Sequence, residues 1–296
     1  LQMGKLQIMF LKYYLQQKKM DKKDITAIIL TYNEEMHIER CINSIKNYVK
    51  QIIIIDSFSN DRTIKICSKF KKIIKVYKNK FVNHSSQLNF ALQKNINSKW
   101  ILRIDADEIV EKNFFNNFNR IKNLNKFNAL KIVVEHNFLG KRISHGGVFP
   151  SPQIRIWKNK LGKFDEKPMD EKVVVKNAKI YNSKLKIIDH NLKGFLFWLK
   201  KHHNYASKEA QLYSLIKQKK ISYKLKDKKF VQKIFYYKFP IFLRPFLLFF
   251  YRYIIKKGFL DGIAGIKFNI LQTLYYRLLV DLFIVMNLVF DKKVNL

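Results

Sequence analysis

Short apolar runs alternate with helical patterns along the first half of the chain. Runs of apolar residues predict buried strands at 25–32, 51–59, 71–79 and 99–108. The segments between them carry apolar residues at helical spacing and predict helices at 34–49, 61–70 and 85–95. Strands that alternate with helices are typical of an α/β fold, in which a mostly parallel sheet is flanked by helices.

The rhythm changes after residue 130. Strand patterns occupy 129–140, 153–159 and 171–182, and the region 193–296 is mostly helical, aromatic and basic. At the other end, the apolar stretch within residues 1–19 is too short to span a bilayer. Met20 resembles a natural start, so we interpret residues 1–19 as an extension of the reading frame or an interfacial helix.

Composition indicates a folded, strongly cationic protein. The 296 residues include 58 Lys and Arg against 22 Asp and Glu, which gives a net charge of +36, and 48% are hydrophobic. Such a charge favours anionic partners, which include nucleic acid, an acidic membrane surface and phosphate-bearing substrates. Lys, Asn and Ile are abundant throughout, as in a base-biased genome, so charge alone is a weak guide. Cys41 and Cys67 lie in apolar segments without metal-ligand spacing, which predicts two buried, reduced thiols.

Polar residues follow three of the predicted strands. Residues 31–35 follow the first strand, residues 56–61 the second and residues 105–108 the fourth. Ligands of open α/β sheets bind outside the carboxyl ends of the strands. The three segments therefore predict one site at a single edge of the sheet.

The third of these segments concentrates acid in a basic chain. Asp105, Asp107, Glu108 and Glu111 lie within "RIDADEIVE". Two carboxylates spaced D-x-D after a strand suit Mg²⁺ or Mn²⁺, which take further ligands from substrate phosphates. A solvated helix start would also attract acidic residues, because they favour the helix dipole.

Taken together, three motifs resemble a known family. "AIILTYNEEMHIERCINSI", "IIIIDSFSNDRTIKI" and "WILRIDADE" are similar to the nucleotide-sugar-binding half of the inverting family-two glycosyltransferases. Later pieces, "PMDEKVVV", "KHHNYASKEA", "RPF" and "GFLDGIAG", resemble a bacterial subgroup that builds lipopolysaccharide core and capsule-type glycans. The resemblance implies a GT-A fold, with a catalytic domain over 20–192 and a membrane-associating helical region over 193–296. Residues 20–115 would bind the nucleotide sugar, and 116–192 would form the acceptor side.

The resemblance also implies roles for individual residues on the donor side. Thr31, Tyr32, Asn33 and Glu34 would line the pocket for base and ribose, and Asp56 would hydrogen-bond the base. Asp105 would approach the ribose or the metal, and Asp107 would bind the divalent cation, Mg²⁺ or Mn²⁺, that bridges the diphosphate. Gln87 belongs to a short polar motif that would contact the diphosphate or sugar. The expected donor is a nucleotide-diphosphate sugar, with uridine as the base by family habit.

Inverting transfer needs a base that takes the proton of the acceptor hydroxyl. Asp170 and Glu171 of "PMDEK" match the family's carboxylate pair, and the choice between them stays open. In "PSPQIRIWKN", Arg155 and Trp157 would face the sugar or acceptor, or Trp157 would belong to the core.

The C-terminal region predicts contact with a membrane. Residues 237–260 and 278–290 are apolar but interrupted by charges and by Pro240 and Pro245, which disfavours a spanning helix. We interpret them as interfacial helices whose cations (Arg244, Arg252, Lys256 and Lys257) reach anionic headgroups, or as helices that pack on the catalytic domain or on a second subunit. The expected acceptor is a membrane glycolipid, and the expected location is peripheral on the inner face of the bacterial cytoplasmic membrane.

Two alternative functions remain. A nucleotidyltransferase also uses paired acids and a metal, but it would carry a Gly-rich phosphate loop after the first strand, where "TYNEE" has no glycine. A basic nucleic-acid-binding protein is suggested by charge alone, and no recognised module supports it, so we expect no nucleic-acid partner.

Overall fold

The computed structural model describes residues 23–138, 140–165, 172–217 and 235–294. These residues fall into two compact units. The first unit holds the chain up to Glu135 together with Ser151–Leu192, and the second holds His136–Pro150 and the chain from Lys193 onward.

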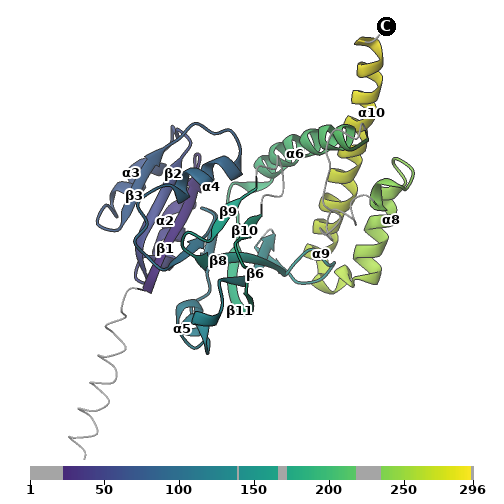
Figure 1. Cartoon of the computed structure of the whole chain (residues 1–296). Helices are drawn as coiled ribbons and strands as arrows, with labels where there is room; N and C mark the ends of the chain where they lie inside the picture. Colours follow the sequence, from purple (N-terminus) through teal and green to yellow (C-terminus); the bar gives the residue numbers. More distant parts are fainter. Residues whose placement is uncertain (1–22, 139, 166–171, 218–234, 295–296) are drawn as a thin grey trace, which may run out of the picture. The chain divides into compact units, whose positions relative to one another are not determined.

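A mixed sheet forms the centre of the first unit (Figure 1). Among the described residues its order is β3-β2-β1-β4-β8-β6-β11-β5, and β7 pairs with the last residues of β6, which like β7 belong to the second unit. The strands are β1 (Lys23–Thr31), β2 (Val49–Asp56), β3 (Ile74–Lys78), β4 (Trp100–Arg103), β5 (Glu108–Val110), β6 (Ala129–Phe138), β7 (Lys141–Ile143), β8 (Ser151–Lys158) and β11 (Ile180–Asp189). Strands β9 (Gly162–Phe164) and β10 (Val173–Val175) form a separate antiparallel pair.

The first four strands pair in parallel. β1 lies parallel to β2 and β4, and β2 lies parallel to β3. The pairs β4–β8, β8–β6 and β11–β5 are antiparallel. The predicted parallel sheet is therefore confirmed for its N-terminal half, and an antiparallel half continues it.

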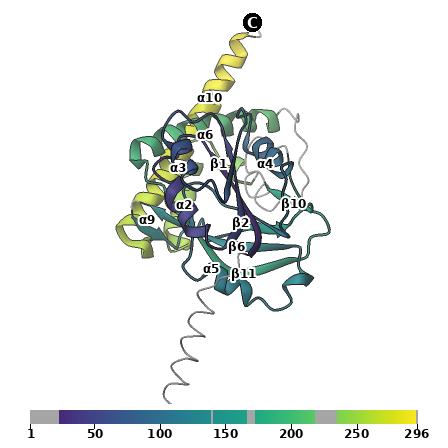
Figure 2. The same cartoon turned by 90° about the vertical axis from the view of Figure 1, so that its left-hand side faces the viewer.

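Helices cover both faces of the parallel half. They are α2 (Ile38–Ile45), α3 (Thr63–Ser68), α4 (His84–Leu92) and α5 (Phe114–Asn119), with a 3-10 turn, η1, at Leu124–Lys126. Ile25, Ala27 and Ile29 of β1 share one core with α2, α3 and α5, whereas Ile28 shares the other core with α4. This alternation follows from the two-residue period of a strand. The four strands and three helices predicted for the N-terminal half are thus all present (Figure 2).

Both cysteines are buried and unpaired, as predicted. Burial raises the pKa of Cys67 to about 12 and that of Cys41 well above its usual value. The thiolate forms are therefore suppressed, and both side chains act as small apolar core residues.

Helices dominate the second unit. They are α6 (Gly194–Lys217), α8 (Arg244–Phe250), α9 (Gly262–Asn269) and α10 (Tyr276–Val294), joined by turns of other helical type at η2 (Tyr251–Ile255), η3 (Gly258–Asp261) and η4 (Ile270–Tyr275). Ala206 and Ala210 of α6 pack against Tyr276, Val280 and Ile284 of α10, and Figure 1 shows these two helices in green and yellow. Small residues on α6 allow this close approach.

Buried charges fix α10 in this unit. Asp281 is fully buried and accepts hydrogen bonds from the guanidinium of Arg244 and from the Phe242 N–H, which lies at 2.9 Å. Arg244 is itself only 1% exposed. The expectation that Arg244 reaches lipid headgroups is therefore wrong, because its charge is used inside the fold.

The structure also changes how the C-terminal apolar runs are interpreted. Pro245 lies in the first turn of α8, where a missing N–H costs no helical hydrogen bond, so it begins a helix and does not break one. Among the described residues, one helical stretch, Gly258–Val289, is long and apolar enough to cross a membrane by length and composition. Core helices of soluble proteins meet the same criterion, and 39% of its most apolar window is buried inside the structure.

The buried Arg244–Asp281 pair gives a stability prediction. Asp281→Ala should lower the free energy of unfolding by about 3–5 kcal/mol, because it leaves a buried guanidinium without its partner. The double variant Arg244→Met, Asp281→Leu should lose much less, because neither charge then remains buried. Urea denaturation followed by circular dichroism measures both. As a control, Glu39→Ala removes an exposed ion pair with Lys69 and should cost less than about 1 kcal/mol. Equal losses in the single and double variants would contradict the assignment.

Candidate active site

The polar segments after β1, β2 and β4 lie at one edge of the sheet. The register pairs Thr31 at the end of β1 with Asp56 at the end of β2, and Ile28 with Arg103 at the end of β4. Because all three strands are parallel, their carboxyl ends point to the same edge. The structure therefore brings together the three segments that the sequence predicted to meet.

Asp56 organises the loop that follows β2. Its carboxylate accepts hydrogen bonds from Thr31 Oγ1 at 2.9 Å, Ser59 Oγ at 2.6 Å and the Ser59 N–H at 2.9 Å. Asp56 is fully buried and Thr31 nearly so. A carboxylate has about four acceptor positions, and these three hydrogen bonds occupy three of them on Asp56. Direct contact of Asp56 with a base stays a prediction.

The loops after β1 and β2 are joined by reciprocal hydrogen bonds. The Asn33 N–H donates to Ser59 Oγ at 2.9 Å, and the Asn60 N–H donates to Asn33 Oδ1 at 2.9 Å. The Glu34 N–H donates to Thr63 Oγ1 at 2.7 Å. Asn33 has a φ of 55°, a left-handed conformation that Asn tolerates better than most residues. These contacts hold residues 33–35 in a fixed shape, while the ring of Tyr32 remains exposed.

Gln87 supports the same edge from α4. Its amide donates to Ser57 Oγ at 3.1 Å and to the Asn79 carbonyl at 3.0 Å, and it accepts from Asn79 Nδ2 at 2.8 Å. The side chain is fully buried. In this structure Gln87 connects the loops after β2 and β3, and its contact with a donor stays a prediction.

Arginine offsets the charge of the acidic turn after β4. Arg155, on β8, donates to Asp105 at 3.2 Å and to Glu108 at 2.6 Å, and Arg103 lies 3.4 Å from Asp105. Burial alone would raise the pKa of Asp105, but Arg103 and Arg155 outweigh it and hold that pKa well below its usual range. Burial raises the pKa of Glu108, against the opposing charge of Arg155. Glu108 Oε2 also accepts from the Asp105 N–H at 2.8 Å, which fixes the turn.

Arg155 and Trp157 are both removed from solvent. Arg155 is 4% exposed and bonds to the acidic turn, and Trp157 is fully buried beside Phe164. The interpretation that these two side chains face a sugar or acceptor is therefore wrong, whereas the core interpretation of Trp157 is confirmed.

Asp107 is held by the segment that follows β11. Asn191 Nδ2 donates to Asp107 Oδ2 at 3.0 Å, and the His190 N–H donates to the Asp107 carbonyl at 3.1 Å. Arg40 of α2 donates to the carbonyls of Asp107 at 3.2 Å and of His190 at 2.6 Å. The position of Asp107 thus depends on residues from two other parts of the chain, α2 and the segment after β11.

His37 connects the first loop to the same segment. Its Nε2 accepts the Leu192 N–H at 2.7 Å, and its Nδ1 lies 2.6 Å from Glu34 Oε2. Since Nε2 accepts, the proton is on Nδ1 and donates to Glu34. His37 is fully buried, so it acts as a fixed bridge between Glu34 and the chain beyond β11.

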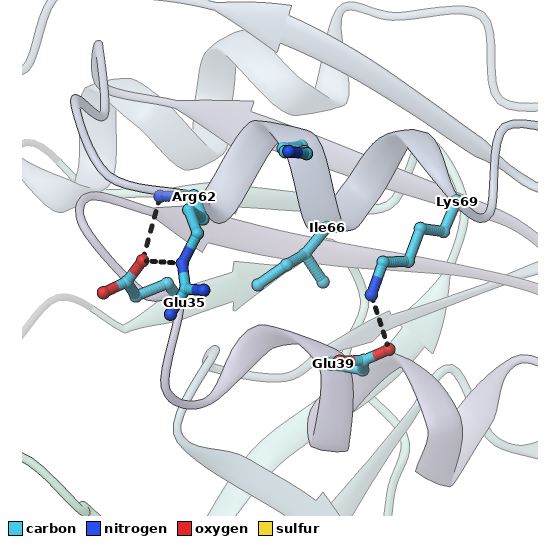
Figure 3. A pocket seen from close by; sticks show the side chains of 6 residues that line it. Glu35, Glu39, Arg62, Ile66 and Lys69 are labelled. Atoms are coloured by element: carbon cyan, nitrogen blue, oxygen red, sulfur yellow. Dashed lines mark hydrogen bonds and ion pairs between the residues drawn. The ribbon is translucent and has the colours of Figure 1, made fainter.

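A surface groove lies beside the site, between α2 and α3 (Figure 3). Arg62 bonds to Glu35 at 3.0 Å and Lys69 to Glu39 at 3.3 Å, so ion pairs cross the groove. Exposed pairs of this kind contribute little to stability. The acidic turn after β4 does not line this groove, and we place the candidate site at the edge that carries Asp105 and Asp107.

Sequence reasoning found the strand-end residues but missed their supports. His37, Arg40, His190 and Asn191 did not enter the predicted site. A signal was present for the last two, because "HN" follows the strand 180–189 as the other polar segments follow theirs. The two candidate bases, Asp170 and Glu171, lie outside the described residues, so their role stays a prediction.

Comparisons with known proteins agree with this geometry. Residues 26–145 match the family model for Glycosyl transferase family 2. An uncharacterized glycosyltransferase of Rickettsia bellii (strain RML369-C) is 40% identical over 90 residues, which cover 30% of each chain. The SPbeta prophage-derived glycosyltransferase SunS of Bacillus subtilis (strain 168) is 30% identical over 117 residues, which cover 40% of this chain and 28% of SunS. The aligned parts thus span about 30% of these relatives' own length.

A solved structure shows the same fold. The mannosyltransferase PcManGT from Pyrobaculum calidifontis, in complex with GDP-Man and Mn²⁺, has a TM-score of 0.50 at 14% identity over 95% of each chain. S. aureus TarS 1-349 in complex with UDP-GlcNAc has a TM-score of 0.42 at 15% identity, covering 58% of this chain and 59% of TarS. The fold of this protein is that of the GT-A glycosyltransferases, followed by C-terminal helices. Residues 26–145 are the part of the chain that resembles the family-two glycosyltransferases.

Proposed function

We propose that this protein transfers a sugar from a nucleotide-diphosphate donor to a lipid-linked or lipopolysaccharide-core glycan, with inversion and in a single displacement. The observation that carries the proposal is the meeting of the three strand-end segments around the acidic turn, within the segment that matches family two. Nucleotidyl transfer and nucleic-acid binding find no support in this geometry or in the comparisons.

The donor would bind along the edge formed by the ends of β1, β2 and β4. The fixed backbone of residues 33–35 and the exposed ring of Tyr32 would face the base and ribose, with Asp56 behind them. Asp105 would approach the ribose, because Arg103 and Arg155 already bond to its carboxylate. Two structural neighbours are solved in complex with UDP-GlcNAc and with GDP-Man, and we expect a UDP-linked sugar here.

The residues present fit a divalent cation held largely by its substrate. The described residues contain no group of three or more His, Cys, Asp and Glu side chains that could enclose an ion. Mg²⁺ and Mn²⁺ bind nucleotides through one or two carboxylates, with waters and phosphate oxygens completing the shell. Asp107 supplies such a carboxylate, oriented by Asn191. When bound, the ion would neutralise the leaving diphosphate.

The remaining residues would hold this arrangement during the reaction. Arg40 and His190 fix the backbone of Asp107, and His37 fixes Glu34 relative to the chain that follows β11. Asp170 or Glu171 would take the proton of the acceptor hydroxyl as its oxygen attacks the anomeric carbon from the face opposite the diphosphate. We place the enzyme peripherally on the inner face of the cytoplasmic membrane, where a glycolipid acceptor is available.

The metal role of Asp107 can be tested by UDP titration with Mn²⁺ and with a chelator. Asp107→Ala should abolish the Mn²⁺-dependent part of UDP binding, because the carboxylate that anchors the ion is lost. Asn191→Ala should weaken Mn²⁺ affinity by about 10-fold or more, the usual effect of losing a residue that orients a metal ligand. Asp24→Ala, which removes an exposed carboxylate paired with Lys50, is the matched control and should bind as the parent does. Undiminished Mn²⁺-dependent binding by Asp107→Ala would remove the metal role.

The base is tested by separating turnover from donor affinity. Either Asp170→Asn or Glu171→Gln should lower turnover by about two to four orders of magnitude, the usual range for losing a general base. UDP affinity should remain near that of the parent, because neither residue belongs to the donor edge. Turnover is measured as nucleoside diphosphate released from a panel of nucleotide sugars with membrane glycolipid as acceptor. Normal turnover in both variants would place the base elsewhere.

A further inference from the structure

The second unit exposes a continuous helical row of apolar side chains. Leu243, Phe246, Leu247, Phe250 and Ile254 recur at helical spacing along α8 and η2, and each is about half exposed. Residues three and four apart share one face of a helix. A soluble surface seldom presents so many aromatic and aliphatic side chains on a single face, so the row indicates a binding surface.

The row leads into an apolar tip at η3 and the start of α9. Phe259, Leu260 and Ile263 are exposed there, and Ile263 is 73% exposed, more than any residue of the row. We call residues 243–263 the apolar hairpin. Its first arm runs along α8 and η2, and its second arm begins at the start of α9, which contacts η2.

Close packing holds the tip in place. A Cβ at Gly265 would lie 2.3 Å from the Gly258 carbonyl oxygen, and one at Gly258 would lie 2.9 Å from the Arg252 carbonyl oxygen, so glycine is required where the arms meet. Asn269, which is buried, donates to the Gly265 carbonyl at 2.8 Å. The tip is therefore a built feature that presents its apolar side chains outward.

Asp261 braces the tip from inside. Its carboxylate accepts the Ser144 and His145 N–H groups at 2.9 and 2.8 Å, and its other oxygen lies 2.7 Å from His145 Nδ1. The Asp261 side chain is only 6% exposed. This is the one acidic residue between positions 235 and 275 of the sequence, and its charge is not presented to solvent.

Every exposed charge around the hairpin is positive. The exposed Lys, Arg, Asp and Glu residues of 235–275 are Lys238, Lys256, Lys257 and Lys267. Arg244 contributes nothing to this surface, because it is buried against Asp281. A surface that combines exposed aromatic and aliphatic side chains with cations alone fits the boundary of an anionic bilayer.

Charge also argues against a second copy of this chain as the occupant. In a symmetric dimer the same patch lies on both subunits, so a contact through this patch would bring Lys256 and Lys257 of both subunits into one interface. Like charges brought together at a desolvated contact oppose association. The lysines are instead complementary to anionic headgroups.

We propose that the apolar hairpin inserts shallowly into an anionic lipid surface, with Phe259, Leu260 and Ile263 entering first and Lys256 and Lys257 at headgroup level. The apolar side chains provide most of the attraction, so binding persists in high salt. The proposal deepens the proposed function, because it names the surface that would bring the enzyme to a lipid-linked acceptor. Vesicle binding does not require sugar transfer, so the two can fail separately.

The test is cosedimentation of the full chain with vesicles of phosphatidylcholine and phosphatidylglycerol that contain no glycolipid. The triple variant Phe259→Ser, Leu260→Ser, Ile263→Ser should lower the partition coefficient by about 10-fold or more, because three lipid-facing apolar side chains are lost. The control triple variant Leu196→Ser, Val82→Ser, Val174→Ser removes apolar side chains outside the hairpin that are at least as exposed, and it should bind as the parent does. Lys256→Gln and Lys257→Gln should each weaken binding about fivefold at low salt and little at 1 M salt.

A second variant measures insertion directly. Ile263→Trp should show blue-shifted emission with these vesicles and quenching by lipids brominated near the headgroup end of the acyl chains. Unchanged binding by the first triple variant, or no quenching at residue 263, would overturn the proposal. Retention of the protein on membranes after alkaline carbonate would show a spanning segment. A lipid-free dimer that the triple variant dissociates would show a subunit interface. Either result would also overturn the proposal.

Mn²⁺-dependent UDP binding in solution should be the same in the parent and the triple variant. Its absence from both would refute the proposed function while leaving the vesicle result intact.

Discussion

Carboxylates gathered at one sheet edge repel one another, and the arrangement around the acidic turn depends on how this repulsion is offset. Arg155 lies almost fully buried between Asp105 and Glu108, and it comes from β8, the first antiparallel neighbour of β4. The antiparallel half of the sheet thus supplies the cation that the parallel half needs. Breaking such a buried network costs far more than losing an exposed ion pair, so the turn is fixed before any ligand arrives.

Asp105 and Asp107 are held by different contacts in this pre-formed turn. Two arginines bond to the Asp105 carboxylate, and Asn191 donates a hydrogen bond to the Asp107 carboxylate. An ion bound to nucleotide phosphates needs a carboxylate in a fixed direction more than it needs many protein ligands. The contacts from α2 and from the chain after β11 provide that direction, and they connect the donor edge to the residues that precede the helical unit.

The sequence predicted the features of the fold that depend on short-range residue spacing. The strand-helix alternation and the polar residues after 25–32, 51–59 and 99–108 placed the edge correctly, because strand period and parallel pairing follow from local apolar spacing. It did not reveal partners that the fold brings from far away, such as Arg40 with His190 or His37 with Leu192, which are about 150 residues apart. It also assigned Arg244 to a headgroup, because only the fold shows that Asp281 buries this charge.

The central claim is that the strand-end segments bind a nucleotide through a cation at Asp107. Anomalous diffraction from crystals of the full chain grown with UDP and Mn²⁺ tests this most directly. The account predicts a manganese peak at the Asp107 carboxylate, bridging to the diphosphate, with uracil near Tyr32 and the Asp56 network. Manganese and UDP bound in the groove between α2 and α3, or anywhere away from Asp107, would contradict it.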